Sequence, residues 1–301
     1  MGNDKPTGQT ILITGATGMM GSALAVALAA DNTVYGAARF RDLAMRDRLE
    51  QAGVQCVQHD LHDADLSAWP SNVDTLMHFA VEWGSDAEKS FDFNGFLVGR
   101  MLEHFSQLDQ FVIGSTVAVY VAGGKIDLTE HSPTIPAGVY GSSKLVGDAI
   151  ATHISRQREL RGAVLRYWFP YSDDLAATSD YYQGLLKRLE RSDTFILPDD
   201  DSGCQQPLFI DDLVRITIDS LQHASTDPFV LNVAGHERLT PRQVVLTMAE
   251  VFEVEPKIEY GPADQCNVLS GSYDLAKLKQ APGLGQVTFR EGMQRLRARH
   301  H

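Results

Sequence analysis

A tyrosine and a lysine lie four residues apart in the segment Tyr140-Gly-Ser-Ser-Lys144. On a helix this spacing places both side chains on one face. A free phenol has a pKa of about 10, too high for proton transfer at neutral pH, and a nearby ammonium would favour the phenolate. The pair therefore suits general acid–base catalysis. Because the spacing also occurs by chance in helices, its context has to support the chemistry.

Two hydroxyls precede this pair at the end of an apolar segment. Ser115 and Thr116 follow residues 111–114, which are typical of a short buried strand. Hydroxyls at the carboxyl end of a strand can hold a substrate oxygen. The sequence thus offers a hydroxyl, a phenol and an ammonium for one site.

A glycine pattern near the N-terminus, Thr14-Gly-Ala-Thr-Gly-Met-Met-Gly21, suits a dinucleotide. Its glycines allow a tight turn and a close approach of the backbone to a pyrophosphate, and the following helix start supplies free amides. Three glycines alone could mark only a turn, but a strand before and a helix after favour the cofactor. We expect the pyrophosphate to contact the turn residues Gly15, Thr17, Gly18, Met19 and Met20.

The end of the second predicted strand indicates which dinucleotide binds. An acidic residue there would bind the ribose 2′-hydroxyl of NAD, but the chain has Ala38 followed by Arg39 and Arg41. Guanidinium groups suit a 2′-phosphate, so we predict NADP, with NAD as the less favoured cofactor. The alternative is that both arginines are solvated loop charges.

Further cofactor contacts are expected where the third and fourth strands end. The carboxylate and backbone after strand three should lie near the adenine, and the backbone after strand four near the nicotinamide ribose. The residues concerned are Asp60, Leu61, Phe79, Ala80 and Val81. His78, just before them, is interpreted as a packed strand residue.

Alternating strands and helices must position these residues. We predict strands over residues 10–14, 33–38, 54–58, 75–80, 111–114 and 163–167, and helices over 19–30, 41–52, 87–105 and 139–160. This order indicates a doubly wound parallel sheet, a Rossmann-type α/β domain over residues 1–170. Shorter helices over 211–223 and 241–252 predict a smaller mixed α/β substrate domain over 171–301, from which the chain can cross back.

Bulk properties exclude several classes of protein. The net charge of -13 argues against nucleic acid or anionic membranes as partners. The three cysteines are far apart without metal-ligand spacing, and Asp211-Asp212 lacks a third ligand, so we expect no metal site and read the pair as a helix N-cap. With no leader or spanning segment detected, we expect a cytoplasmic protein.

At this point the chain resembles the extended short-chain dehydrogenases/reductases of the NAD(P)-dependent epimerase/dehydratase group. The resemblance implies that Tyr140 is the general acid/base, that Lys144 lowers its pKa and binds ribose, and that Thr116 polarises the reacting oxygen while Ser115 is structural. It also implies a homodimer through helical faces of residues 87–105 and 139–160. The motifs are TGATGMMG, His78-Phe-Ala80, residues 115–120, Pro136 to Lys144, Leu165-Arg-Tyr167, residues 209–212 and Leu231-Asn-Val233.

The chain departs from its sugar-nucleotide relatives at three places. Sugar-nucleotide dehydratases have Asp-Glu where this chain has Val117-Ala118, which argues against dehydration. Epimerases commonly have an asparagine at the position of Phe169 and an arginine near Gln205-Gln206. Because neutral amides are poor phosphate clamps, these departures argue against a nucleotide-diphosphate sugar.

Aromatic residues are expected to overhang the nicotinamide and form a weakly charged substrate pocket. They could instead simply pack the interior. We predict an NADP-dependent oxidoreductase acting on a small carbonyl or alcohol, with a sugar or nucleotide-sugar epimerase as the alternative and a non-catalytic NADP sensor ranked last. The predicted substrate contacts besides Thr116 are Glu82, Trp83, Trp168 and Tyr182, and Phe169 is predicted to touch the cofactor.

Overall fold

The computed structural model describes residues 5–63, 65–67, 69–120, 127–174, 178, 180–199, 202–262, 265–268, 276–278 and 285–300. Seven strands form one sheet in the order β10-β6-β5-β4-β1-β2-β3, and each pairing from β3 to β6 is parallel. This confirms the predicted doubly wound sheet. The strands are β1 (Thr10–Thr14), β2 (Thr33–Ala38), β3 (Gln55–Gln58), β4 (Thr75–His78), β5 (Gln110–Thr116), β6 (Arg161–Tyr167) and β10 (Phe229–Val233).

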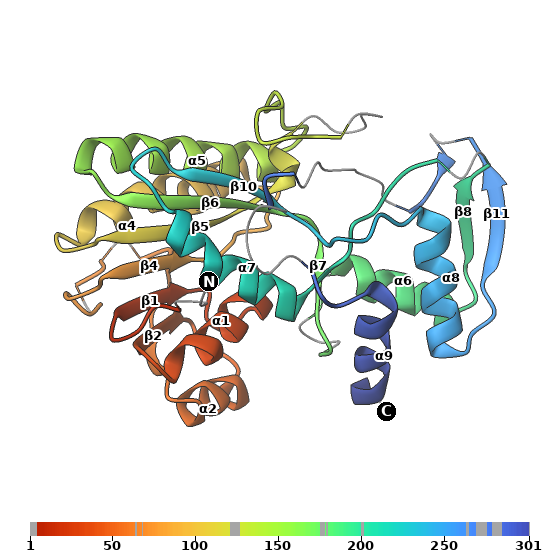
Figure 1. The fold of residues 1–301 in the computed structure, drawn as a ribbon, viewed down its shortest axis with the longest axis horizontal. Coiled ribbons are helices and arrows are strands. Elements are labelled where there is room, and N and C mark those ends of the chain that lie inside the picture. The colour runs from red at the N-terminus through yellow and green to blue at the C-terminus, as the bar shows by residue number, and fades with distance from the viewer. Residues whose placement is uncertain are drawn as a thin grey trace. The chain divides into compact units, whose positions relative to one another are not determined.

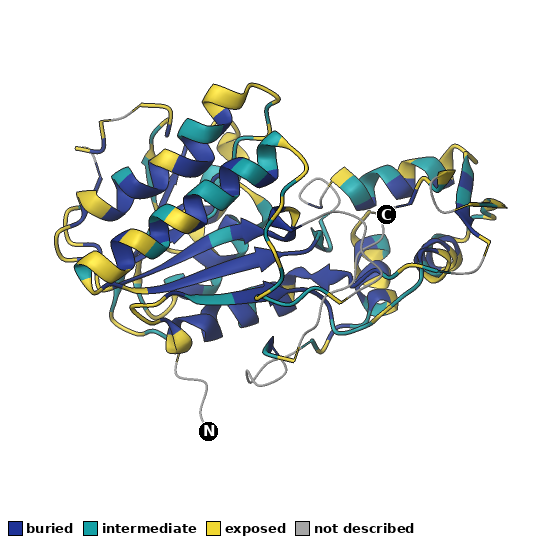
Figure 2. Ribbon diagram, turned by 90° about the horizontal axis from the view of Figure 1, so that it is seen from above, coloured by how far each residue is buried: buried dark blue, intermediate teal, exposed yellow. Residues whose placement is uncertain are grey.

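Helices cover both faces of this sheet (Figure 1). On one face lie α4 (Leu97–His104) and α5 (Val139–Arg158), and on the other lie α1 (Met19–Ala29), α2 (Leu43–Gln51) and α7 (Ile210–His223). The strands between them are mostly buried (Figure 2), as expected for a parallel sheet covered on both sides.

The register of the paired strands determines which side chains of the sheet pack against α4 and α5. Leu12 pairs with Leu76, and Leu76 pairs with Phe111, so the three side chains point to the same face. They pack in one core cluster with Met101 of α4 and Ile154 of α5. The order of strands reverses at β1, which is where doubly wound sheets bind their ligands.

The helix predicted over residues 87–105 is interrupted. The structure has α3 (Ala87–Phe91), a π-helical turn η1 (Asp92–Phe96) and then α4. The prediction of one continuous helix was wrong, because a local π turn changes the hydrogen-bond spacing without changing the apolar pattern.

By its internal contacts the chain forms two units. The first comprises residues 1–121, 133–167 and 214–231, and the second comprises residues 122–132, 168–213 and 232–301. The predicted division at residue 170 is therefore too simple, since residues 214–231 return to the first unit. They bring most of α7 and the start of β10, with the hydroxyls of Tyr167 and Thr217 2.7 Å apart.

The second unit contains short parallel pairs and three further helices. Strand β8 pairs with β11, and β7 pairs with β9. Most of these elements were not predicted from the sequence, although α8 was. Their bounds are β7 (Pro170–Tyr171), α6 (Asp180–Glu190), β8 (Thr194–Pro198), β9 (Leu208–Phe209), α8 (Pro241–Phe252), β11 (Lys257–Gly261) and α9 (Phe289–His300). Among the described residues, no helix is long and apolar enough to cross a membrane.

Candidate active site

The predicted phenol, hydroxyl and ammonium lie together in the first unit. Tyr140 is in the first turn of α5, where Gly141 lets the helix pass close to the backbone carbonyl of Ala118, just beyond β5. The hydroxyl of Thr116 is near enough to the phenol of Tyr140 to lower the pKa of that phenol. Lys144 follows one turn later and is 2% exposed. The three side chains are thus held by the end of one strand and the start of one helix.

The protein by itself keeps the phenol neutral. Burial raises the pKa of Tyr140 to about 12, the contact with Thr116 opposes this, and the charge of Asp148 adds to it. In the protein alone, burial outweighs the contact with Thr116, and Lys144 is not among the groups that shift the pKa of Tyr140. The lowering of this pKa by Lys144 together with the nicotinamide stays a prediction for the cofactor-bound protein.

Lys144 is a buried lysine whose pKa is far below that of a free lysine. Burial lowers the pKa of Lys144 to about 8, while the charge of Asp148 one turn further along α5 partly opposes the shift. An ammonium held out of water is suited to bind a hydroxyl of a ligand, since a ligand contact replaces lost hydration.

The glycine turn fits a dinucleotide. Gly15 has a φ of +71°, and a Cβ there would lie 2.6 Å from the amide nitrogen of Ala80, so only glycine allows β1 to end this close to β4. A Cβ at Gly21 would collide with the carbonyl of Gly15. The first turn of α1 carries no side-chain cap, which leaves its amides to bind an anion. We expect this turn to hold the pyrophosphate and Lys144 the nicotinamide ribose.

His78 links the same two strand ends. Its Nδ1 lies 2.7 Å from the hydroxyl of Thr14, and the residue is fully buried. Burial, with a smaller contribution from Lys144, lowers the pKa of His78 to about 3, so it is neutral. His78 is a packed strand residue, as its position predicted.

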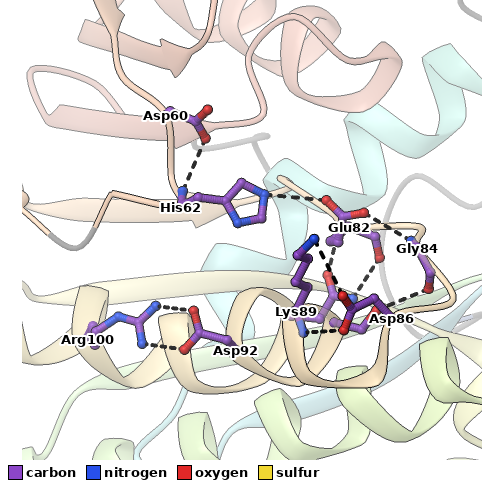
Figure 3. Close-up of polar contacts among 10 residues, drawn as sticks. Asp60, His62, Glu82, Gly84, Asp86, Lys89, Asp92 and Arg100 are labelled. Carbon is purple, nitrogen blue, oxygen red and sulfur yellow. Dashed lines mark hydrogen bonds and ion pairs between the residues drawn. The ribbon is translucent and has the colours of Figure 1, made fainter.

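The predicted cofactor residues near strands two to four differ in exposure. Arg39 and Arg41 are exposed and flank Phe40, which is 4% exposed and has a φ of 47°. The Asp60 carboxylate accepts the amide of His62 at 3.2 Å (Figure 3). The side chain of Leu61 lies in the core, which leaves its backbone as the candidate contact. The ring of Phe79 packs against the ring of Tyr167. Ala80 and Val81 follow Phe79, and the backbone of Ala80 lies next to Gly15 of the glycine turn.

The loop after β4 is held by a residue that sequence reasoning missed. Asn94, in the π turn, accepts the amide of Glu82 at 3.0 Å and donates to the carbonyl of Glu82 at 2.9 Å. Its side chain also donates to the hydroxyl of Ser143 at 3.1 Å, and Ser143 donates to the carbonyl of Tyr140 at 2.9 Å. No pattern in the sequence predicts these contacts of Asn94, because they depend on the π turn.

The predicted substrate residues of this loop lie beside the catalytic set. The Glu82 carboxylate accepts the amide of Gly84 at 3.0 Å and lies 3.5 Å from Nε2 of His62 (Figure 3). Trp83 stacks on the ring of Tyr140, with 4.3 Å between the ring centroids and an angle of 28° between the planes.

A buried ion pair behind the site was also missed. Asp148 and Arg166 lie 3.3 Å apart, and Arg166 donates to the hydroxyl of Tyr120 at 2.8 Å. Burial raises the pKa of Asp148, against the opposing effects of Arg166, the Ser115 hydroxyl and Lys144. Ser115 pairs with Arg166 across β5 and β6, and its buried hydroxyl makes no hydrogen bond within the described residues, so its structural role stays a prediction.

The remaining predicted contacts belong to the second unit. Trp168 is 5% exposed and meets Phe169 edge-on at 4.9 Å. Tyr182 is 1% exposed and packs against Tyr171 and Phe289. The prediction that Tyr182 lines a substrate pocket is better replaced by a core role, since these rings surround it.

Two interpretations of polar residues in this unit need correction. Gln205 and Gln206 are 0% and 1% exposed, and Gln205 donates to the hydroxyl of Tyr181 at 2.6 Å. They are core residues, which their reading as substitutes for a phosphate-binding arginine did not anticipate, and residues 202–210 contain no arginine. Asp211 and Asp212 were predicted to cap α7 but lie in its first turn. Asp212 instead accepts the amides of Gln286 and Val287.

Comparisons with known proteins agree with this site. The sequence profile of the NAD dependent epimerase/dehydratase family matches residues 11–234. A UDP-glucose 4-epimerase of Azospirillum brasilense is 31% identical over 171 residues, which are 52% of this chain and 48% of that enzyme, so the match spans about half of the relative's length. A Bacillus subtilis (strain 168) protein described as an uncharacterized UDP-glucose epimerase is 22% identical over 90% of both chains.

Solved structures show the same fold. The UDP-glucuronic acid 4-epimerase of Bacillus cereus in complex with NAD superposes with a TM-score of 0.82, at 21% identity over 97% of this chain and 100% of that one. The UDP-N-acetylglucosamine 4-epimerase of Methanobrevibacter ruminantium M1 gives 0.84, at 16% identity over 98% and 99%.

Proposed function

Because the chain belongs to the NAD dependent epimerase/dehydratase family, we propose that it is a 4-epimerase of UDP-sugars. The observation that carries the proposal is the grouping of Thr116, at the end of β5, with Tyr140 and Lys144, at the start of α5. The names of the Azospirillum, Bacillus subtilis and Bacillus cereus proteins support the substrate class.

Each residue has a role in moving the proton. To act as a base, Tyr140 has to be ionised in the reacting complex, where the positive charges of Lys144 and of a bound oxidised nicotinamide would favour the phenolate. The phenolate oxygen takes the proton of the sugar hydroxyl and the phenol later returns one, while Thr116 holds the sugar oxygen. Lys144 binds the nicotinamide ribose and adds positive charge near the phenol. A bound nicotinamide would supply reversible hydride transfer at the sugar carbon. Since the hydride returns, the reaction leaves no net reduced cofactor.

A label-retention experiment tests this proposal. The purified protein is incubated with NAD or NADP and with UDP-glucose carrying deuterium at C4, and with UDP-N-acetylglucosamine and UDP-glucuronic acid in parallel. We expect the 4-epimer of at least one of these sugars by NMR and no net change at the absorbance band of reduced nicotinamide. With the glucose substrate, deuterium should stay at C4 because the same hydride returns.

The matched variant is Tyr140→Phe, which keeps the ring and removes the acid. We expect turnover to fall by a factor of about 10² or more, the size of a general acid–base contribution, with dinucleotide binding nearly unchanged. Undiminished turnover in this variant would refute the role of Tyr140.

A carbonyl reductase, the first prediction from the sequence, is the second candidate. Its support is the pair of exposed arginines after β2 and the aromatic pair Trp168 and Phe169. It predicts net oxidation of NADPH with a panel of small carbonyls and no conversion of the labelled UDP-glucose. The family match and the named relatives favour the epimerase instead.

We further propose that the chain accepts NADP. Arg39 and Arg41 are exposed on either side of a buried phenylalanine, and Ala38 supplies no acid for a ribose diol. The double variant Arg39→Ala/Arg41→Ala should weaken NADP binding about tenfold or more, as expected for lost charged contacts, and change NAD binding little. Calorimetry with both dinucleotides measures this, and equal losses for the two would contradict the assignment.

A homodimer and a cytoplasmic location stay predictions. Within one chain α4 and α5 already pack against each other, so part of the surface proposed for dimer contact is used internally. Light scattering on the purified protein would decide the oligomeric state.

A further inference from the structure

Trp83 is an indole that the fold holds at the surface beside the catalytic tyrosine. It is 69% exposed, the highest value among the large apolar side chains of the described residues. One face stacks on Tyr140 at 4.3 Å. Core packing does not explain a large aromatic side chain that remains mostly in water.

The backbone on both sides of Trp83 is fixed. Asn94 binds both the amide and the carbonyl of Glu82, at 3.0 and 2.9 Å. On the other side, the carboxylate of Glu82 accepts the amide of Gly84 at 3.0 Å (Figure 3). The loop therefore presents the indole in a defined place.

The same asparagine fixes the partner ring. Asn94 donates to Ser143 at 3.1 Å, and Ser143 donates to the carbonyl of Tyr140 at 2.9 Å. One buried amide thus sets the distance between the loop that carries the indole and the helical turn that carries the phenol. The stacking of the two rings follows from this connection.

We infer that Trp83 is a positioning residue for Tyr140, which holds the plane of the phenol ring and shields one of its faces so that the hydroxyl stays directed at Thr116. The inference rests on the proposed function, in which Tyr140 is the proton carrier. Proton transfer requires the phenol oxygen within hydrogen-bond reach of the substrate, and a displacement of about 1 Å can reduce rates about 10²-fold.

If Trp83 only contacted the substrate, its substitution would have different effects from those expected of a positioning residue. Trp83 has a second, exposed face, and the sequence predicted that it touches the substrate. If it acted only there, its loss would raise KM and leave the free protein's phenol unchanged. A positioning role instead lowers kcat and changes the titration of Tyr140 before any substrate is added.

The titration experiment uses the protein without substrate. Tyrosinate absorbance is recorded against pH for the parent chain, Trp83→Ala and Trp83→Phe, each with its Tyr140→Phe counterpart as the blank. The polar and charged groups that act on the phenol are Thr116 and Asp148; Lys144 interacts with Asp148, and His78 is neutral beside Lys144. We expect the pKa of Tyr140 to fall from about 12 toward its ordinary value of about 10 in Trp83→Ala.

The kinetic experiment measures kcat and KM for the UDP-sugar that the parent chain converts. Trp83→Ala should lower kcat about tenfold or more with KM changed less than about threefold, and Trp83→Phe, which keeps a stacking ring, should restore most of kcat. Tyr260→Ala removes another exposed aromatic residue, 53% exposed and in the second unit, and should leave both constants unchanged.

Several results would overturn the inference. An unchanged titration with an unchanged kcat would assign Trp83 to substrate contact or to no role. Equal damage by Trp83→Phe and Trp83→Ala, with normal circular dichroism in both, would exclude ring stacking as the cause. If the parent chain converts no UDP-sugar, the proposed function fails, but the titration still decides whether Trp83 controls the phenol.

Discussion

Lys144 carries its charge at a buried position in the site, where desolvation disfavours the charged form. Its ammonium is 2% exposed, and burial lowers its pKa to about 8, against 10.5 for a free lysine. At neutral pH the folded protein must therefore keep a charge where desolvation disfavours it. A residue under such a penalty is explained by function rather than by stability.

We predict that Lys144→Met stabilises the fold at pH 7 while it abolishes turnover. The unfolded lysine keeps its proton up to pH 10.5 and the folded one up to about 8, so the unfolded state binds more protons between these values. The parent's stability therefore rises with pH across that window. The variant should gain about 2–3 kcal/mol at pH 7, an advantage that shrinks between pH 8 and 10.5.

Urea unfolding at pH 7 and pH 10 measures this difference. Lys187→Met, at an exposed position of α6, is the control and should change stability little at either pH. A less stable Lys144→Met at pH 7 would show that its charge contacts outweigh desolvation.

Among the elements, the π turn η1 has the largest influence on the site. It lies between α3 and α4 and carries Asn94, which is fully buried and binds Glu82 and Ser143. Short π-helical segments within α-helices are frequent at functional sites. Here the turn connects the loop after β4 to the start of α5.

We predict that Asn94→Ala loosens this connection. The amide and carbonyl of Glu82 lose their partner, so the free energy of unfolding should fall by about 1–3 kcal/mol. The loop that carries Trp83 should exchange its backbone amides faster, which hydrogen exchange at residues 82–84 measures.

Thr240→Ala provides a stability-matched control. It removes the capping box of α8 in the second unit and should cost about 1 kcal/mol without changing exchange in the 82–84 loop. Equal exchange rates in the parent and Asn94→Ala proteins would contradict the proposed connection.

Much of the first unit could be predicted from the sequence. Apolar runs ended by glycine or polar residues identified β1, β2 and β5, and alternation with helices gave the parallel sheet, because buried strands have a clear composition. The spacing of Tyr140 and Lys144 predicted that both lie on one helix, which α5 confirms. These features depend on local pattern.

The features that could not be predicted depend on contacts between residues that are far apart in the sequence. Gln205 and Gln206 stand where an epimerase arginine was sought but are in the core, and Asp212 binds amides 74 and 75 residues away instead of capping its helix. The phenol's raised pKa follows from burial, which spacing alone does not reveal. Long-range packing therefore decided each of these cases.

At the scale of the whole molecule, the first unit is discontinuous in sequence. Residues 214–231 return to it after the second unit has begun. They add β10 beside β6 and attach through Gly162, whose amide donates to the carbonyl of Ser225 at 2.8 Å. The unit is therefore incomplete without residues from the later part of the chain.

We predict that the fragment 1–170 does not fold as an independent domain. It lacks β10 and α7, so one edge of the sheet and apolar surface normally covered by α7 become exposed. Circular dichroism and dye binding should show no cooperative unfolding near the full chain's midpoint and exposed apolar surface. A fragment that melts like the intact protein would contradict this prediction.

The return of residues 214–231 also has a consequence for synthesis of the protein. After Tyr167 has left the ribosome, 64 further residues must follow before Leu231 appears. At about 5–20 residues per second this takes roughly 3–13 s, during which the outer edge of β6 stays open. Nascent chains are thus exposed to edge-to-edge association for seconds, and a chaperone that holds this edge would raise the yield of native protein.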